Sequence, residues 1–95
     1  MAASREADLI CRYVEPNPHR PGLDEARLKG FGVAVWALVG HLPAVDGNIA
    51  QVAHNYGVPL EAVEAALAYY DRHRAIIDAR IAANRPDHDT ILQSL

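Results

Sequence analysis

Tyr56–Tyr70, YGVPLEAVEAALAYY, is the stretch of sequence that decides the fold. Gly57 permits a sharp reversal of the chain, because glycine adopts left-handed backbone angles without steric cost. Pro59 suits the first position of a helix, where its missing N–H has no helical partner. Glu61 and Glu64 then stand in the opening turns, where carboxylates complement the helix dipole. The stretch therefore predicts a turn followed at once by a helix.

The residues around Gly57 follow the spacing of a helix-turn-helix. Such a motif needs a small residue in its first helix, a glycine at the turn, and apolar residues one and six positions after it. Those positions hold Ala53, Val58 and Val63. The spacing predicts two helices clamped at a steep angle, as in many DNA-reading proteins.

Three helices are expected in this part of the chain. Apolar residues recur on one helical stripe, with Trp36 beside it, until Pro43 closes the first helix. Asp46 is a natural N-cap for the second helix, which is expected to end at Gly57. The third helix meets no breaker before Asn84, so we expect one continuous rod of about 25 residues, or roughly 37 Å.

The expected third helix carries a row of residues spaced alternately three and four apart, which is a heptad seam. No earlier part of the chain is long enough to cover the distal half of this row. An exposed isoleucine row promotes aggregation, so a second copy of the helix or another protein is expected to cover it. The alternative is a tail that folds back through Ile91 and Leu92. Arg74 is expected to pair with Asp71, with Asp78 or with an acidic group of the partner. The residues assigned to this dimer or partner interface are Leu67, Tyr70, Arg74, Ile77 and Ile81.

The N-terminal part of the chain is expected to form an arm. Leu9–Glu15 favours a short strand, and Ala26–Gly32 could pair with it as a second strand. Between them, PNPHRPG (16–22) carries three prolines and a glycine, which forbids regular structure. The chain thus divides into an arm with a short β-ribbon over 1–32, a tri-helical domain over 33–84 and a flexible tail over 85–95.

Composition indicates one mainly α-helical domain of a soluble, cytoplasmic protein. Ninety-five residues suffice for a single modest core. Cys11 is the only cysteine, which excludes an intrachain disulfide and favours a reducing compartment. In the expected strand it would be a small buried apolar residue. The most apolar stretch, Phe31–Val39, is too short to cross a bilayer, and no run of signal-peptide length is present.

The charge pattern argues against DNA reading by the third helix. Between Gly30 and Asp71 the sequence has no lysine or arginine, whereas DNA affinity comes chiefly from neutralised phosphates. The neutral donors nearby are Asn48, Gln51 and Asn55. Cations gather upstream instead, where paired arms of a dimer could grip DNA; an ordinary solvated face is the alternative. The residues assigned to possible DNA or partner contact are Arg12, Arg20, Arg27 and Lys29.

No pattern typical of catalysis is found in the sequence. The histidines His41, His54, His73 and His88 show no metal-ligand spacing, and CxxC and HExxH motifs are absent. Asp87-His88-Asp89 could be a ligand trio but is more often a polar chain end. A phosphate-binding loop, a nucleophile elbow and a convincing carboxylate pair are also missing. We therefore expect no catalytic residue, no cofactor, no metal and no small-molecule substrate.

The run Val52–Ile81 resembles the C-terminal part of the small bacterial family called domain of unknown function 433. The residues that carry the resemblance are Val63, Ala65, Ala66, Leu67, Ala68, Tyr69, Tyr70, His73, Ile77 and Asp78. Upstream, Lys29–Trp36 (KGFGVAVW) resembles the approach of that family to its first helix. It keeps the glycine and valine pattern at Gly30, Gly32, Val33 and Val35, but the Thr-Arg pair of the family is absent. The resemblance covers about residues 26–84.

This resemblance implies an antitoxin-like protein with a homeodomain-like tri-helical core. Such VapB-type proteins bind and block a PIN-like toxin nuclease, and some repress their own operon. We therefore expect a non-enzymatic interaction protein that dimerises and binds a partner protein by a steric mechanism. A DNA-binding transcriptional regulator acting on its own operon through basic N-terminal arms is the alternative, and a metal-dependent enzyme is a third hypothesis. Residues that could compete for the metal or substrate phosphates of the partner are Arg20, Arg27, Asp87 and Asp89.

Overall fold

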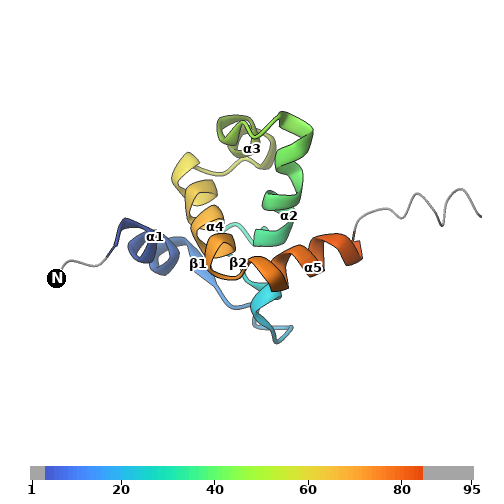
Figure 1. Cartoon of the computed structure of the whole chain (residues 1–95). Coiled ribbons are helices and arrows are strands. Elements are labelled where there is room, and N and C mark those ends of the chain that lie inside the picture. Colours follow the sequence, from blue (N-terminus) through green and yellow to red (C-terminus); the bar gives the residue numbers. More distant parts are fainter. Residues whose placement is uncertain (1–3, 85–95) are drawn as a thin grey trace, which may run out of the picture.

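Helix α4 (Leu60–Arg72) forms the centre of the structure, a computed structural model that describes residues 4–84. The other helices of this part are α1 (Arg5–Tyr13), α2 (Val35–His41), α3 (Ile49–Tyr56) and α5 (Arg74–Asn84). All four contact α4, which lies between them in Figure 1. The buried residues of α4 are mostly alanines, and their small side chains let neighbouring helices approach it from several sides. They are Ala62, Val63, Ala65, Ala66, Ala68 and Tyr69.

The predicted helix ends are confirmed at Gly57 and wrong at Asp46. Gly57 ends α3 with a left-handed φ of 66°, and its N–H bonds the carbonyl of His54. Asp46 does not cap α3: it has a φ of 54° and follows the 3₁₀ turn η2 (Leu42–Val45). The N-cap is Asn48, whose side-chain oxygen accepts the N–H of Gln51 at 3.1 Å. Pro59, expected as the first helical residue, is instead the N-cap of α4.

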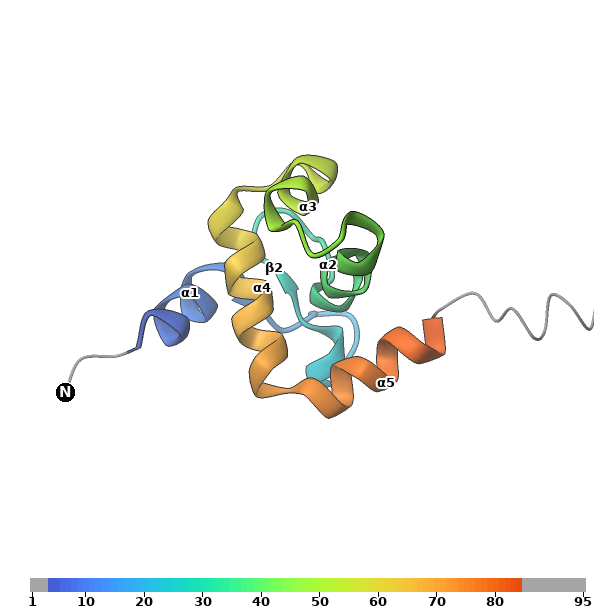
Figure 2. The same cartoon turned by 45° about the horizontal axis from the view of Figure 1, so that its top comes forward.

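The prediction of one continuous third helix is wrong. At His73 the backbone leaves the helical region, with φ −137° and ψ 39°, and separates α4 from α5. The His73 N–H still closes the last turn of α4 by donating to the Tyr70 carbonyl at 2.9 Å. Its own carbonyl accepts the N–H of Ile77 and starts α5. Figure 2 shows α5 leaving α4 at a clear angle.

The bend at His73 places α5 against its own chain. Ile77, which a straight helix would have pointed away from the domain, is 0% exposed within the core. Ile81 is half-buried and packs against the same core. The covering elements are α2 and the 3₁₀ turn η1 (Leu23–Glu25), so the expectation that nothing earlier in the chain could cover this row is wrong. A second copy is therefore not needed to bury Ile77.

The N-terminal segment folds as a helix where a strand was expected. Ser4 caps α1 by accepting the N–H of Ala7 at 3.0 Å, and Glu6 and Asp8 complement the dipole in the first turn. Leu9 is buried against the core, with Ile10 packed beside it. The residues of this stretch favour a strand locally, but the N-cap and the packing of one apolar face on the core stabilise a helix instead.

The predicted β-ribbon is confirmed as a pairing but is shorter than expected. Strand β1 (Val14–Glu15) pairs antiparallel with β2 (Arg27–Leu28), with Val14 opposite Leu28 and Glu15 opposite Arg27. The proline-rich loop between them ends in η1, and an isolated bridge joins Arg27 to Ala34 before α2. The ribbon thus belongs to the core, because Leu28 is 0% exposed.

The mainly α-helical fold class is confirmed. The helices are accompanied by one small two-stranded sheet. Within residues 4–84, no helix has both the length and the apolar character needed to cross a membrane. The expected fold-back through Ile91 and Leu92 lies outside the described residues, as do residues 1–3.

Candidate functional site

One candidate site is a groove between α1 and α4, which we call the α1–α4 groove. It has a volume of about 430 Å³, and three of the predicted interface residues, Leu67, Tyr70 and Arg74, line it. Apolar side chains form one part of the lining: Leu9, Ile49, Leu67, Ala68 and Tyr70. Charged side chains of both signs form the rest: Arg5, Glu6, Glu64, Asp71 and Arg74.

The charges along the α1–α4 groove are paired within the chain. Arg5 donates to Glu64 at 3.1 Å across the groove, and Arg74 donates to Asp71 at 2.6 Å along α4 and α5. The predicted pairing of Arg74 with Asp71 is therefore confirmed, and this hydrogen bond raises the pKa of the guanidinium. Arg74 also lies 5.1 Å from the centre of the Tyr70 ring. These contacts hold the rim side chains in place around the apolar lining.

Tyr70 separates this groove from a second depression, the Tyr70 hollow, between α2 and α5. The hydroxyl of Tyr70 donates to the Asp78 carboxylate at 2.8 Å, and this hydrogen bond raises the pKa of the phenol. The hollow measures about 280 Å³. Its lining residues are Val39, Gly40, Pro43, Tyr70, Asp78, Ile81 and Ala82. Tyr70 and Ile81, both predicted interface residues, therefore share this depression.

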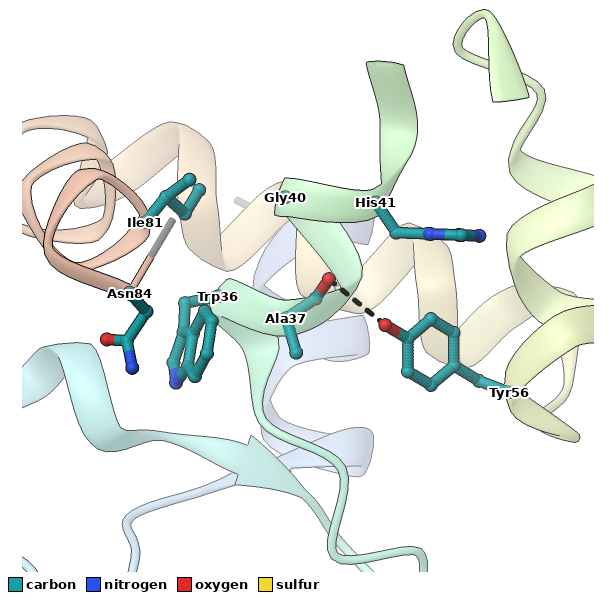
Figure 3. A pocket seen from close by; sticks show the side chains of 7 residues that line it. All are labelled: Trp36, Ala37, Gly40, His41, Tyr56, Ile81 and Asn84. Atoms are coloured by element: carbon teal, nitrogen blue, oxygen red, sulfur yellow. Dashed lines mark hydrogen bonds between the residues drawn. The ribbon is translucent and has the colours of Figure 1, made fainter. Parts of the chain in front are cut away.

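A third depression, the Trp36 pocket, lies on the other side of Gly40 and Ile81 (Figure 3). It measures about 370 Å³, and its lining residues are Trp36, Ala37, Gly40, His41, Tyr56, Ile81 and Asn84. The Tyr56 hydroxyl donates to the Ala37 carbonyl at 3.3 Å, which ties α3 to α2. His41 meets the Tyr56 ring edge-on, with 5.5 Å between ring centres. The sequence placed Trp36 beside the helical stripe but gave no sign that Tyr56 and Asn84 would join it.

A chain of side-chain hydrogen bonds holds the His41 ring. Gln51 Nε2 donates to Asn55 Oδ1 at 2.8 Å, which orients the Asn55 amide. Asn55 Nδ2 then faces His41 Nε2 at 3.0 Å, and the amide donates in the tautomer that leaves this ring nitrogen as an acceptor. Gln51 and Asn55 are two of the three neutral donors expected near a DNA-reading helix, and the third, Asn48, caps α3. Gln51 and Asn55 are bonded instead to each other and to His41.

The cations assigned to the N-terminal arm are spread over several elements, and each has a partner in the chain. Arg12 lies 4.0 Å from Glu61 and Arg20 lies 3.7 Å from Glu25. The Arg27 guanidinium donates to Glu15 at 2.9 Å across the β-ribbon. Lys29 donates to the carbonyl of Cys11 at 2.6 Å. Cys11 itself is exposed on α1, which corrects the expectation of a buried apolar residue.

The two glutamates at the start of α4 face α1. Glu61 accepts a hydrogen bond from the Tyr13 hydroxyl at 2.9 Å, and this bond raises the pKa of the phenol. Glu64 accepts the bond from Arg5 already described. At the same N-terminal end of α1 as Arg5, Arg72 of α4 donates to the Ser4 hydroxyl at 3.3 Å. Helix α1 thus covers one long side of the helix that a helix-turn-helix protein would present to DNA.

Within residues 4–84, no three His, Cys, Asp or Glu side chains are grouped as metal ligands. The trio Asp87-His88-Asp89, with Asp87 and Asp89 as suggested partner contacts, lies outside the described residues. Comparison with known proteins finds no matching family, no similar curated protein and no similar solved structure. The resemblance to domain of unknown function 433 therefore stays a prediction.

Proposed function

We propose that this chain is a non-enzymatic, antitoxin-like interaction protein that forms a homodimer and binds a partner protein. Its helices α2, α3 and α4 form the homeodomain-like helix-turn-helix core in this proposal, and α1 and α5 adapt that core to protein binding. The observation that carries the proposal is the α1–α4 groove, where an apolar lining is edged by charges of both signs.

The α1–α4 groove has the anatomy of a protein-binding site. Protein interfaces combine an apolar centre that excludes water with a polar edge that stays solvated. Leu67 and Tyr70 supply the apolar centre, and Tyr is one of the residues enriched at such centres. Arg5, Glu64 and Arg74 supply an edge whose salt bridges are exposed and can exchange partners at small free-energy cost. The fitting ligand is a protein segment that inserts an apolar side chain between flanking charges.

The proposed partner is a PIN-like toxin nuclease, and this step rests on the sequence resemblance. Binding in the α1–α4 groove supports a steric mechanism, in which this protein covers part of the partner. Arg20 and Arg27, suggested as competitors for the substrate phosphates of the partner, are already paired with Glu25 and Glu15. The groove is therefore a better supported contact than these arm residues.

The alternative of a DNA-binding regulator has less support from the contacts in the chain. Every arginine among residues 4–84 lies within 4.0 Å of a carboxylate, so each positive charge has a negative neighbour that repels phosphates. Helix α4 has Glu61 and Glu64 at its start and α1 along its side. Neither the arm nor α4 thus offers a row of free cations.

The test is co-purification with the product of the neighbouring open reading frame. The wild-type chain and the Leu60→Glu variant are expected to capture it, because Leu60 is 44% exposed on α4 and lies outside the groove lining. Leu67→Glu is expected to lose capture by at least about tenfold, as for the central residues of other interfaces. A thermal melt of each variant checks that it folds.

Equal capture by both variants, or none by the wild type, would contradict the proposal. A shift of operator DNA that is lost in the Arg20→Ala, Lys29→Ala double variant would favour the DNA-binding alternative instead.

A further inference from the structure

Within residues 4–84, no contact requires glycine at position 40 in α2. It lies inside a helix, where glycine destabilises relative to alanine. A Cβ atom at this position would lie 3.6 Å from Ile81 Cγ2, which is an ordinary van der Waals distance. Its φ is not in the left-handed region, in contrast to Gly22, Gly30, Gly32, Gly47 and Gly57. Alanine would therefore fit the isolated chain at least as well.

Gly40 is exposed and stands between two depressions. The Tyr70 hollow and the Trp36 pocket share it as a lining residue, together with Ile81. Figure 3 shows Trp36 and Ile81 to one side of Gly40 and His41 and Tyr56 to the other. A side chain at position 40 would rise between these depressions, so the glycine lets another backbone approach α2 closely there.

The surface around Gly40, which we call the α2 face, is poor in charge. Among the residues that line its two depressions, Asp78 alone has a formal charge with histidine neutral, and it accepts the Tyr70 hydroxyl. Two tyrosines and a tryptophan line the same depressions. Depletion of charge together with enrichment of Tyr and Trp distinguishes the centre of a protein interface from the rest of a surface.

We infer that the α2 face is the homodimer interface, in which α2 of one copy crosses α2 of a second copy at Gly40. A two-fold axis brings the same patch of both copies together, so Gly40 meets Gly40 and the helices approach closely. Trp36 of each copy then packs near the second copy. A face with a single formal charge, that of Asp78, can meet itself with little like-charge repulsion, although the chain has a net charge of −3. This inference rests on the proposed function, in which the chain forms a homodimer, and it names the surface through which the two copies meet. It does not involve the α1–α4 groove.

The test compares Gly40→Ala and Gly40→Gln with the wild type by sedimentation equilibrium over a concentration series. The wild type is expected to reach twice the mass of one chain. Gly40→Ala should weaken the dimer while the melting temperature, measured at concentrations where the chain is monomeric, stays equal or rises. Gly40→Gln should raise the dimer dissociation constant by at least about tenfold. Trp36, the only tryptophan, should show a red shift of its fluorescence on dilution of the wild type.

Ala75→Gln is the matched control, because Ala75 is exposed on α5 and lines neither depression. It is expected to dimerise as the wild type does. A monomeric wild type, or a Gly40→Gln dimer as tight as that of the wild type, overturns the inference. Monomeric Gly40 variants should still capture the partner, so failure of this interface is distinguishable from failure of the α1–α4 groove.

Discussion

The guanidinium of Arg80 lies 4.9 Å from the centre of the Trp36 ring, and it contacts the Glu25 carboxylate at 2.6 Å. A second contact, at 3.3 Å, joins it to Asp24. Arg80 therefore connects α5 to α2 and to η1 at once. Its side chain is 17% exposed, and the hydrogen bond to Glu25 raises the pKa of the guanidinium.

Replacement of Arg80 by Met is expected to lower the free energy of unfolding by about 1–3 kcal/mol, because two half-buried carboxylates lose their main cation. Urea denaturation measures this loss. Arg74→Met is the control, because its salt bridge with Asp71 is exposed and its loss should lower the free energy of unfolding far less. Equal losses in both variants would show that the Arg80 contacts do not stabilise the fold.

Ile77→Ala is expected to cost about 2–5 kcal/mol of folding free energy, the range for large-to-small changes in a core. Ile77 is 0% exposed within its own chain, whereas the adjacent Ile76 is 38% exposed. Ile76→Ala should therefore cost under about 1 kcal/mol, as exposed substitutions usually do. If Ile77→Ala dissociated a dimer and left the stability of the monomer unchanged, Ile77 would lie in a dimer interface and α5 would not pack on the core of its own chain.

Asp46 and Asn48 are expected to respond to substitution in opposite ways. Asn48→Ala removes the N-cap of α3 and should cost about 1 kcal/mol. Asp46→Gly should be neutral or slightly stabilising, because φ at this residue is 54° and glycine adopts such angles freely. Thermal melts of the two variants show which residue caps α3. If Asp46 were the cap, Asp46→Gly would lower the melting temperature more than Asn48→Ala does.

The stability of the fold is expected to fall in alkaline solution through Tyr69. Its hydroxyl donates to the Leu23 carbonyl at 2.7 Å, and burial, together with the charge of Asp24, raises its pKa. Since the folded pKa lies above the unfolded value of about 10, the contribution of the protonated phenol is complete below about pH 10 and is lost as the pH rises through the folded pKa.

Urea midpoints measured from about pH 8 to 11 should therefore fall less steeply for Tyr69→Phe than for the wild type. Part of the fall should remain in the variant, because the pKa values of Tyr13 and Tyr70 are raised in the same direction. Identical slopes would exclude Tyr69 as a source of the pH dependence.

Local signals in the sequence predicted the turn at Gly57 and the helices on either side of it. A glycine with positive φ and a proline at a helix start act through their own backbones, so the residues alone suffice. The break at His73 has no such signal, because neither glycine nor proline is present there. It is decided by packing, since only the bend brings Ile77 into the core.

The candidate site was also predictable only where its residues are neighbours in one helix. Leu67, Tyr70 and Arg74 are neighbours along one helical face, so their grouping in the α1–α4 groove follows from helical spacing. The wall that α1 adds could not be foreseen, because Arg5 and Glu64 are 59 positions apart in the chain. Ile10 and Tyr13 favoured a strand locally, although Ser4 supplied the cap of a helix.

The docking of α1 on α4 also sets an order of events during synthesis. A ribosome makes the chain from its N-terminus, so α1 emerges before α4, which follows it by more than forty residues. Until Glu64 has left the ribosome, Arg5 lacks its salt-bridge partner, and Leu9 has no core to enter. Residues that are far apart in the chain meet slowly because loop closure costs entropy. Helix α1 is therefore synthesised well before it can pack on α4, and its apolar side remains open to chaperones or to other copies in the meantime.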